Sequence, residues 1–330
     1  MVKTIFLFPG QGAQHSGMGK DLWETYEVVK HLFDEASHIC GQDMKHLLFE
    51  ADEQVLKQTV NTQTAVTLMN ISVREVLQLH GITSCASAGF SLGELSALYD
   101  AGTIGFEDLM ILAKHRAETL DACSRFLSDQ GGGPAMAAVI GLDFAAVSSI
   151  VAEKRNGHVY ASNDNSPTQV SISGLADAVN AIKPALMEAG ARRVIPLKVS
   201  GPFHTPLLQD AADMFRESLD AVQWKPFSKP CCSNASGGFF TSPEEVPELC
   251  WKQIVSPVRW VDVMKHLKTV TGHAAVESGP GTVLTGLWKS VVPELPCFAV
   301  GSAQQVDALK DQIQILERED LHGQASSAEG

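Results

Sequence analysis

The sequence lacks several features that would each define a class of protein. No apolar run reaches the roughly 18 residues needed to cross a bilayer, and Met1 leads at once into an apolar segment without room for a signal peptide. Its seven cysteines form neither a CxxC motif nor a Cys/His metal spacing. We therefore expect a reduced, cytoplasmic protein that has no membrane span and no structural metal.

Positive charge is also scarce. The chain carries 25 Lys and Arg residues against 38 Asp and Glu residues, which gives a formal net charge of −13. Nucleic-acid binding requires a basic stripe that contacts phosphates, so a nucleic-acid partner is excluded. The 45% hydrophobic content of the 330 residues is nevertheless ample for a globular core.

Short apolar runs alternate with longer helical patterns over the first 128 residues. The runs at 3–8 and 85–90 end at turns and predict buried strands. Helical periodicity is present at 21–40, 62–80, 92–101 and 107–126. Strands that alternate with helices of this length predict a parallel sheet covered by helices on both faces, an α/β fold.

The pattern changes after Ser128, where Asp-Gln-Gly-Gly-Gly-Pro reads as a linker. Short elements then follow in the order β-α-β-β-α-β, which is typical of a ferredoxin-like fold. They comprise strands at 136–140, near 159 and 170, and at 193–197, with helices at 144–153 and 176–189. We predict a discontinuous core of residues 1–128 and 198–316, a small subdomain at 129–197, and a flexible polar tail at 317–330.

The strongest local motif is Gly89-Phe-Ser-Leu-Gly93, a GxSxG between a predicted strand and a predicted helix. This context is that of a nucleophile elbow, although a plain turn with an incidental serine fits the same letters. A serine nucleophile needs a base. His204 follows a predicted strand on a Gly-Pro loop, where α/β sheets place functional groups. The residues alone leave three other histidines as alternatives: His158, His266 and His273.

Eight segments stand in the same order as the motifs of one known family, over about residues 4–290. They are FPGQGAQ at 8–14, GFSLGE at 89–94, the Arg116 helix, AMAAVIGL at 135–142, NDNSP at 163–167 with 169–174, GPFH at 201–204, QIVSPVRW at 253–260 and ESGPG at 277–281. Together they resemble the malonyl-CoA:acyl-carrier-protein transacylase family. One departure is Phe90, since bacterial relatives usually have histidine before the nucleophile.

The resemblance implies both a fold and a reaction. The fold would be an α/β-hydrolase-like parallel-sheet core with the ferredoxin-like subdomain inserted. The enzyme would be an acyltransferase that moves malonyl from malonyl-CoA to the phosphopantetheine thiol of an acyl carrier protein, with a ping-pong mechanism through a malonyl-serine. Fatty-acid synthesis is the commoner setting of this reaction. Coenzyme A is then a substrate, no cofactor is implied, and a monomer is expected.

The resemblance also assigns roles to residues of the catalytic step. Ser91 would be the nucleophile and His204 the general base, and the backbone N–H groups of Gln11 and Leu92 would form the oxyanion hole. A main-chain carbonyl beside Gln253 would orient the histidine in place of a triad aspartate.

Further positions would select the substrate. Arg116 would form a forked hydrogen-bonded pair with the malonyl carboxylate, although in isolation it could be a solvated charge on a helix. Phe203 would occupy the space that an α-methyl group requires. Gln63 and Asn163, together with Asn165, would supply supporting polar contacts.

Three other functions remain open from the sequence. A free-standing polyketide malonyltransferase would use the same site, and a serine acyl hydrolase could use the same Ser91–His204 pair with water as acceptor. The third alternative is a catalytically silent module that binds carrier protein. The HGGG-type oxyanion motif of many esterases is missing, and a binding module has no need of Ser91, His204 and Arg116 together.

Overall fold

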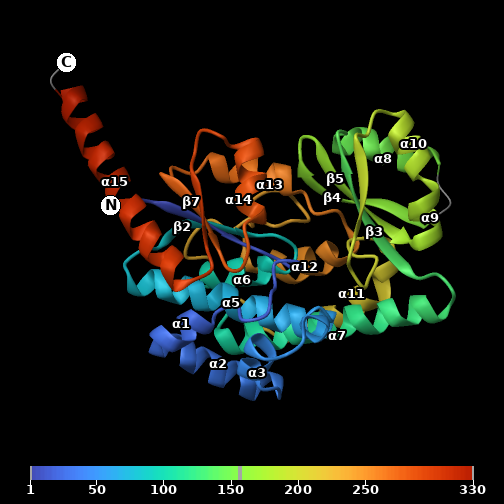
Figure 1. Ribbon diagram of the computed structural model, residues 1–330, viewed down its shortest axis with the longest axis horizontal. Coiled ribbons are helices and arrows are strands. Elements are labelled where there is room, and N and C mark those ends of the chain that lie inside the picture. The colour runs from blue at the N-terminus through green and yellow to red at the C-terminus, as the bar shows by residue number, and fades with distance from the viewer. Residues whose placement is uncertain (1, 155–157, 329–330) are drawn as a thin grey trace.

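The computed structural model describes residues 2–154 and 158–328, in which the strands form two separate sheets (Figure 1). The first sheet is parallel, with the strand order β2-β1-β7-β8. Its strands are β1 (Thr4–Phe8), β2 (Ser84–Gly89), β7 (Ala274–Ser278) and β8 (Cys297–Val300). Strands from the two ends of the chain are therefore neighbours in one sheet.

The side chains of β1 point alternately into two apolar layers. Phe6 and Phe8 belong to one core cluster, whereas Ile5 and Leu7 belong to another on the opposite face. Because successive side chains of a strand point to opposite faces, a strand buried on both faces shows a continuous apolar run. The N-terminal run of the sequence has this form.

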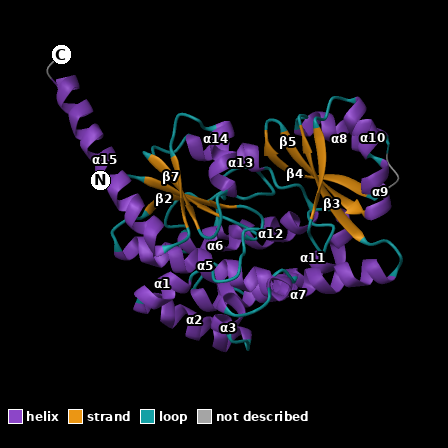
Figure 2. Cartoon of the chain, in the orientation of Figure 1, coloured by secondary structure: helices purple, strands orange, loops and turns teal. Residues whose placement is uncertain are grey.

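Helices cover both faces of this sheet (Figure 2). Helices α2, α5, α6, α7 and α11 contribute to the cluster of Phe6, while α13 and α14 contribute to the cluster of Ile5. The bounds are α1 Lys20–Thr25, α2 Glu27–Cys40, α3 Met44–Phe49, α4 Glu53–Leu56, α5 Thr59–Leu79, α6 Gly93–Asp100, α7 Phe106–Asp129, α11 Gln209–Asp220, α12 Val246–Val255, α13 Trp260–Lys268 and α14 Val283–Val291, with 3-10 turns at Pro206–Leu208 and Pro243–Glu245.

The second sheet is antiparallel, with the order β4-β5-β3-β6. Its elements are β3 (Pro134–Ile140), α8 (Phe144–Glu153), β4 (Val159–Ser166), β5 (Gln169–Leu175), α9 (Ala176–Ala181), α10 (Lys183–Glu188) and β6 (Arg193–Leu197). This strand order and connection are those of the ferredoxin-like fold. The molecule is thus an α/β protein whose parallel-sheet core is accompanied by a small antiparallel subdomain.

The two faces of the second sheet have different neighbours. Ala137 and Val139 of β3 pack with Val147 and Val151 of α8 in a third apolar cluster. Met136 and Ala138, on the opposite face, line a cavity shared with the first sheet. Alternation along one strand therefore separates the core of the small subdomain from the surface that faces the larger one.

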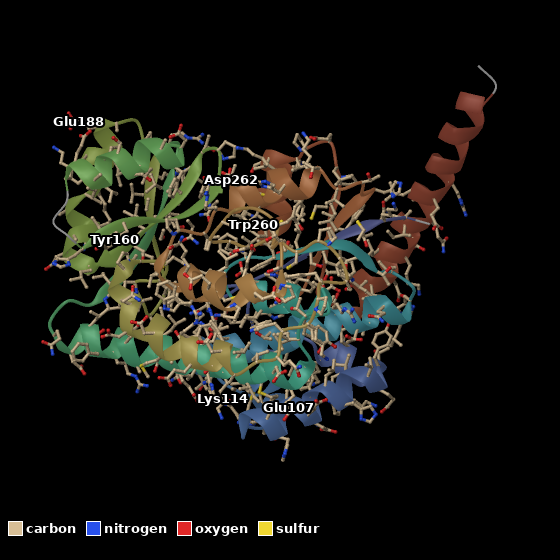
Figure 3. All side chains as sticks on the ribbon, turned by 180° about the vertical axis from the view of Figure 1, so that it is seen from behind. Glu107, Lys114, Tyr160, Glu188, Trp260 and Asp262 are labelled. Atoms are coloured by element: carbon tan, nitrogen blue, oxygen red, sulfur yellow. The ribbon has the colours of Figure 1, made fainter. Side chains whose placement is uncertain are left out.

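Hydrogen bonds join β4 directly to the segment before α13. The N–H of Asp164 donates to the carbonyl of Val258 over 2.9 Å, and the N–H of Val258 donates to the carbonyl of Ser162 over 2.9 Å. Trp260 at the start of α13 is fully buried, whereas polar side chains such as Glu107 and Glu188 lie on the outside (Figure 3). These contacts fix one edge of the small subdomain against the core.

Two helices expected from the sequence are each divided in the structure. The expected helix at 21–40 is broken at Tyr26, whose φ of −118° and ψ of 121° are extended. The expected helix at 176–189 is interrupted at Ile182, and Pro184 lies in the first turn of α10. Proline has no N–H to donate and is tolerated in a first turn, which favours a new helix start there.

The C-terminal segment, expected as a flexible polar tail at 317–330, is helical over its described residues. Helix α15 (Ala303–Ala328) includes residues 317–328 and extends away from the body of the molecule in Figure 1. Good helix formers, including Gln, Leu, Glu and Arg, explain its helical form. Of the helices within the described ranges, none combines the length and apolar character that a membrane span requires.

Candidate active site

A sharp turn at Ser91 joins β2 to α6. Ser91 has a φ of 52°, in the left-handed region that residues with a Cβ atom rarely adopt. The flanking glycines allow very close packing: a Cβ atom on Gly93 would lie 2.1 Å from the carbonyl oxygen of Phe8, and one on Gly89 would lie 1.8 Å from the carbonyl oxygen of Gly93. Glycine is therefore required on both sides of the serine.

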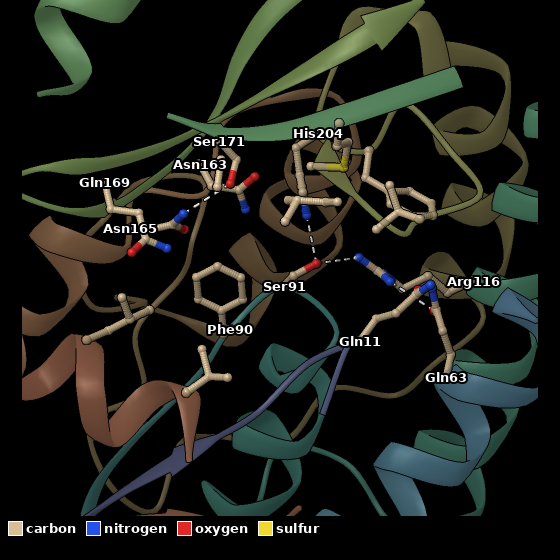
Figure 4. A pocket seen from close by; sticks show the side chains of 17 residues that line it. Gln11, Gln63, Phe90, Ser91, Arg116, Asn163, Asn165, Gln169, Ser171 and His204 are labelled. Atoms are coloured by element: carbon tan, nitrogen blue, oxygen red, sulfur yellow. Dashed lines mark hydrogen bonds between the residues drawn. The ribbon is translucent and has the colours of Figure 1, made fainter. Parts of the chain in front are cut away.

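His204 is placed to take the proton of Ser91 (Figure 4). Its Nε2 lies 2.7 Å from the Ser91 Oγ, and its Nδ1 lies 2.8 Å from the main-chain carbonyl oxygen of Gln253. Since a carbonyl oxygen only accepts hydrogen bonds, Nδ1 carries the proton and Nε2 is left as the acceptor. Burial, and then the charge of Arg116, lower the pKa of His204 to about 4, so the ring is neutral near pH 7.

Arg116 of α7 lies on the other side of the Ser91 hydroxyl. Its guanidinium donates to the Gln63 Oε1 over 2.9 Å, to the Gln253 Oε1 over 3.1 Å and to the Ser91 Oγ over 3.3 Å. Burial lowers its pKa to about 10, which still leaves it charged at pH 7. Within the described part of the chain no carboxylate forms an ion pair with it. A buried cation in this state favours an anionic ligand.

The loop after β1 packs closely against the turn at Ser91. A Cβ atom on Gly10 would lie 2.4 Å from the carbonyl oxygen of Phe90 and 3.6 Å from the nitrogen of Leu92. Gln11, the next residue of this loop, lines the same cavity as Ser91. The loop after β1 and the start of α6 thus lie side by side at one end of the sheet, next to Ser91.

The cavity lies between the two sheets and has a volume of about 250 Å³. The small subdomain provides a polar wall from β4 and β5, including Asn163, Asn165 and Ser171. On that wall Asn165 donates to the Ser171 Oγ over 3.0 Å, and its own Oδ1 is buried without a partner among the described residues. The parallel-sheet core provides apolar side chains, among them Phe90 and Phe203.

The cavity gathers most of the residues singled out from the sequence. Its lining includes Gln11, Gln63, Ser91, Arg116, Asn163, Phe203 and His204. The alternative histidines lie elsewhere: His158 beside α9, His266 against Phe239, and His273 directly before β7, where its Nδ1 accepts from the N–H of Lys3. Phe90 packs edge-on against Trp260 with ring centroids 5.3 Å apart, so its ring fits the site without a polar partner.

Two buried polar residues behind the turn were not singled out from the sequence. Glu94 and Asn234 are both completely buried, and both lie within hydrogen-bonding distance of the backbone around Ser91 or of each other. Glu94 reads in the sequence as an ordinary acidic residue in the first turn of a helix, and Asn234 as a turn former. The position of Glu94 inside the GFSLGE segment, directly after the second glycine, was the one sequence signal that could have linked it to the site.

The described residues contain no group of three or more His, Cys, Asp or Glu side chains that could hold a metal ion. The chemistry that the site can perform on its own is acyl transfer through a serine ester. It brings together a serine hydroxyl, a neutral imidazole oriented by a carbonyl, and a buried cation.

Comparison with known proteins places this arrangement in a family. Residues 5–309 match the family model described as "Acyl transferase domain", and the chain belongs to this family. Among its curated relatives, the malonyl CoA-acyl carrier protein transacylase of Bacillus subtilis strain 168 is 38% identical over 322 residues, which cover 97% of this chain and 99% of the relative. The transacylase of Escherichia coli K12 is 34% identical over 310 residues, 93% of this chain and 99% of the relative.

Solved structures agree with the curated relatives. The crystal structure of the malonyl CoA-acyl carrier protein transacylase from Clostridium perfringens superposes with a TM-score of 0.90 at 30% identity, covering 96% of this chain and 99% of that one. A type II polyketide acyl-carrier protein in complex with its malonyl-transacylase matches with a TM-score of 0.87 at 33% identity, covering 92% of this chain and 97% of that one. The chain therefore has the fold of an acyltransferase of this kind.

Proposed function

We propose that this enzyme transfers the malonyl group of malonyl-CoA to the phosphopantetheine thiol of an acyl carrier protein, in the service of fatty-acid synthesis. One observation carries the proposal: the Ser91 Oγ lies between a neutral His204, at 2.7 Å, and the buried Arg116, at 3.3 Å. A nucleophile beside a buried cation suits an acyl group that bears its own carboxylate, as malonyl does.

In the first half-reaction the Ser91 Oγ attacks the thioester carbonyl while its proton passes to the His204 Nε2. The carbonyl oxygen becomes an oxyanion, for which the N–H groups of Gln11 and Leu92 are the proposed donors. When the intermediate collapses, the C–S bond breaks and the coenzyme A sulfur takes the proton from His204. The product is a malonyl ester on Ser91.

The second half-reaction reverses these steps with a different thiol. The carrier-protein thiol gives its proton to the His204 Nε2 and attacks the ester carbonyl. The bond between the acyl carbon and the Ser91 Oγ then breaks, and the proton returns from His204 to Ser91. The reaction is a ping-pong exchange and needs no cofactor.

Arg116 is the proposed selector of the acyl group. Two parallel N–H···O bonds match the geometry of a carboxylate, and the amide of Gln63 holds the guanidinium from the other side. A neutral acyl group would leave the buried charge unpaired, at a cost of several kcal/mol. Phe203 limits the space beside the acyl carbon, and Asn163 adds a polar contact on the opposite wall.

The proposed partners are malonyl-CoA and an acyl carrier protein. Relatives are named as malonyl CoA-acyl carrier protein transacylases, and one solved relative is in complex with its acyl-carrier protein. We also propose that the enzyme acts as a monomer.

Intact-protein mass spectrometry after mixing with malonyl-CoA tests the proposal. We expect a malonyl adduct on the unaltered protein, none on Ser91→Ala, and weak labelling of Arg116→Ala. Equal loading from acetyl-CoA, or no adduct from malonyl-CoA, would contradict it. Adding carrier protein in its phosphopantetheine form then separates transfer from hydrolysis, since only transfer moves the malonyl mass onto the carrier.

A further inference from the structure

The loop that follows Cys232 passes directly behind the turn at Ser91 and places one side chain against it. The Asn234 Oδ1 accepts a hydrogen bond from the N–H of Ser91 over 2.7 Å. The Asn234 Nδ2 donates to the carbonyl oxygen of Gly89 over 2.8 Å. A single amide therefore connects the last residue of β2 to the nucleophile, across the tightest point of the turn.

The backbone at this point needs such a partner. A positive φ at a residue with a Cβ atom is sterically unfavourable and persists only where the surroundings hold it. The N–H of Ser91 lies between the strand and the helix, so neither ladder pairs it, and a buried backbone group left unpaired is costly. The amide of Asn234 supplies both an acceptor and a donor in a rigid plane.

Glu94 in turn holds Asn234. Its Oε2 accepts the backbone N–H of Asn234 over 2.5 Å, and its Oε1 lies 3.6 Å from the Cys250 Sγ, which donates to it. Glu94 is on α6, the helix that begins directly after the serine turn. The contacts thus form a closed circuit from α6 through Glu94 and Asn234 back to Ser91.

We propose that Asn234, anchored by Glu94, is a positioning residue that holds the Ser91 backbone in its left-handed conformation and so keeps the Ser91 Oγ aligned with His204. The inference rests on the proposed function only in taking Ser91 as the nucleophile. Apart from Ser91, no residue that lines the cavity makes a hydrogen bond to Asn234 among the described contacts, so substrate binding does not depend on Asn234 directly.

This role predicts a defect in the chemical step alone. If the amide is removed, the turn relaxes and the Oγ moves away from Nε2, while the site for the malonyl carboxylate remains. Displacements of about 1 Å at a reacting group can cost on the order of 100-fold in rate. We therefore expect the loading rate constant at saturating malonyl-CoA to fall about 10- to 100-fold in Asn234→Ala.

Single-turnover loading of the full chain, followed by intact mass against malonyl-CoA concentration, separates rate from binding. In Asn234→Ala the half-saturating concentration of malonyl-CoA should stay within about two-fold of the value for the unaltered protein, because a defect confined to the chemical step leaves substrate binding unchanged. Ser236→Ala is the matched control: it lies on the same loop, and the hydrogen bonds described for its hydroxyl go to Gly238, so its rate should not change. The proposal would be overturned by a normal loading rate constant in Asn234→Ala, or by a change confined to the half-saturating concentration of malonyl-CoA.

A second variant and a second probe keep the test decisive. Asn234→Asp retains an acceptor for the N–H of Ser91 but turns an oxygen toward the carbonyl of Gly89, so its rate should also fall about 10-fold or more; an unaltered rate would count against the role of both bonds. An alkyl fluorophosphonate reports on the turn without malonyl-CoA, because Ser91 Oγ bonds to phosphorus, fluoride leaves and His204 takes the proton. Slower labelling of both variants supports the positioning role even if malonyl is not the natural acyl group.

Discussion

At the residue scale, two basic side chains share the surroundings of one hydroxyl. Arg116 and His204 are both buried beside the Ser91 Oγ, and the charge of Arg116 adds to burial in disfavouring a protonated His204. The guanidinium stays charged, with a pKa of about 10, and the imidazole stays neutral. In the proposed mechanism, the charged Arg116 binds the anionic acyl group and the neutral His204 serves as the base.

The pH dependence of loading should reflect this division. With the pKa of His204 lowered to about 4, the base is already deprotonated at pH 6, so kcat/KM should hold from pH 8 to about 5.5 and fall only as His204 gains a proton nearer pH 4. A stopped-flow or quenched-flow profile measures it, and a midpoint near 6.5 that persists in the Glu94→Gln variant would contradict it. Burial also raises the pKa of Glu94 to about 7. If the pH profile shows a second transition near pH 7, its loss in the Glu94→Gln variant assigns that transition to Glu94.

Replacing Arg116 by lysine should not preserve selectivity. An ammonium is a point donor and cannot form two parallel bonds to a carboxylate. We expect Arg116→Lys to lower kcat/KM for malonyl-CoA by at least about 10-fold, equivalent to the loss of one charge-assisted hydrogen bond. Arg125→Lys, at an exposed position of the same helix, is the matched control and should load normally. Steady-state kinetics with malonyl- and acetyl-CoA measure both variants.

How far single residues could be assigned from the sequence depends on how local their signals are. The elbow around Ser91 is a continuous motif and was found from its letters. The residues alone could not separate His204 from three other histidines, and the resemblance to a family was needed to choose it. Asn234 lies 143 positions from Ser91, and nothing in a Ser-Asn-Ala-Ser segment marks its side chain as turned toward a distant turn.

At the scale of elements, the contact between β1, β2 and α6 is unusually close. Glycine at position 93 allows α6 to begin against the carbonyl of Phe8. Tyr26, which breaks the expected helix at 21–40, shows the limit of periodicity: apolar spacing continued through the break, so the pattern gave one helix where the chain forms two. The spacing of apolar residues shows which face of a helix is buried. It does not reveal a change in chain direction, because the spacing can continue unchanged through the bend.

Two glycine substitutions in helices should therefore have opposite effects. Gly93→Ala would place a Cβ atom 2.1 Å from a backbone oxygen and should lower the free energy of unfolding by more than about 2 kcal/mol. Gly286 is at an exposed position within α14, where an added Cβ atom would have no neighbour within 4 Å, and Gly286→Ala should raise stability by about 0.4–1 kcal/mol. Urea unfolding measures both. Equal effects would show that close packing does not decide the outcome.

At the scale of the whole molecule, the site belongs to neither sheet alone. The parallel core supplies Ser91, Arg116 and the loop of Gln11, whereas the antiparallel subdomain supplies the wall with Asn163. The order of elements predicted both folds from the sequence. The cavity between them could not be derived in this way. The relative orientation of the core and the small subdomain depends on contacts such as those of Val258 with β4, which leave no periodic pattern in the sequence.

Neighbouring alanines on β3 test which face turns to the cavity. Ala138 lines the cavity, so Ala138→Phe should fill it and reduce loading by about 10-fold or more while changing stability little. Ala137 is packed in the small subdomain's core, so Ala137→Phe should instead lower the free energy of unfolding by about 1–3 kcal/mol. Unfolding curves and loading rates of both variants decide the matter, and the reverse assignment of effects would show that the faces are exchanged.

The pairing of β3 with β6 has a consequence for how the site is assembled as the chain folds. These strands begin and end the antiparallel subdomain, and they lie side by side, with Met136 opposite Leu197. Ser91 and His204 are 113 positions apart, and bringing distant positions together costs more entropy as the loop between them lengthens. Once the small subdomain has formed from its own local contacts, the connection from Ser91 to His204 is shortened to α6, α7 and the brief segments that flank them. Early folding of the inserted unit would therefore bring Ser91 and His204 together faster.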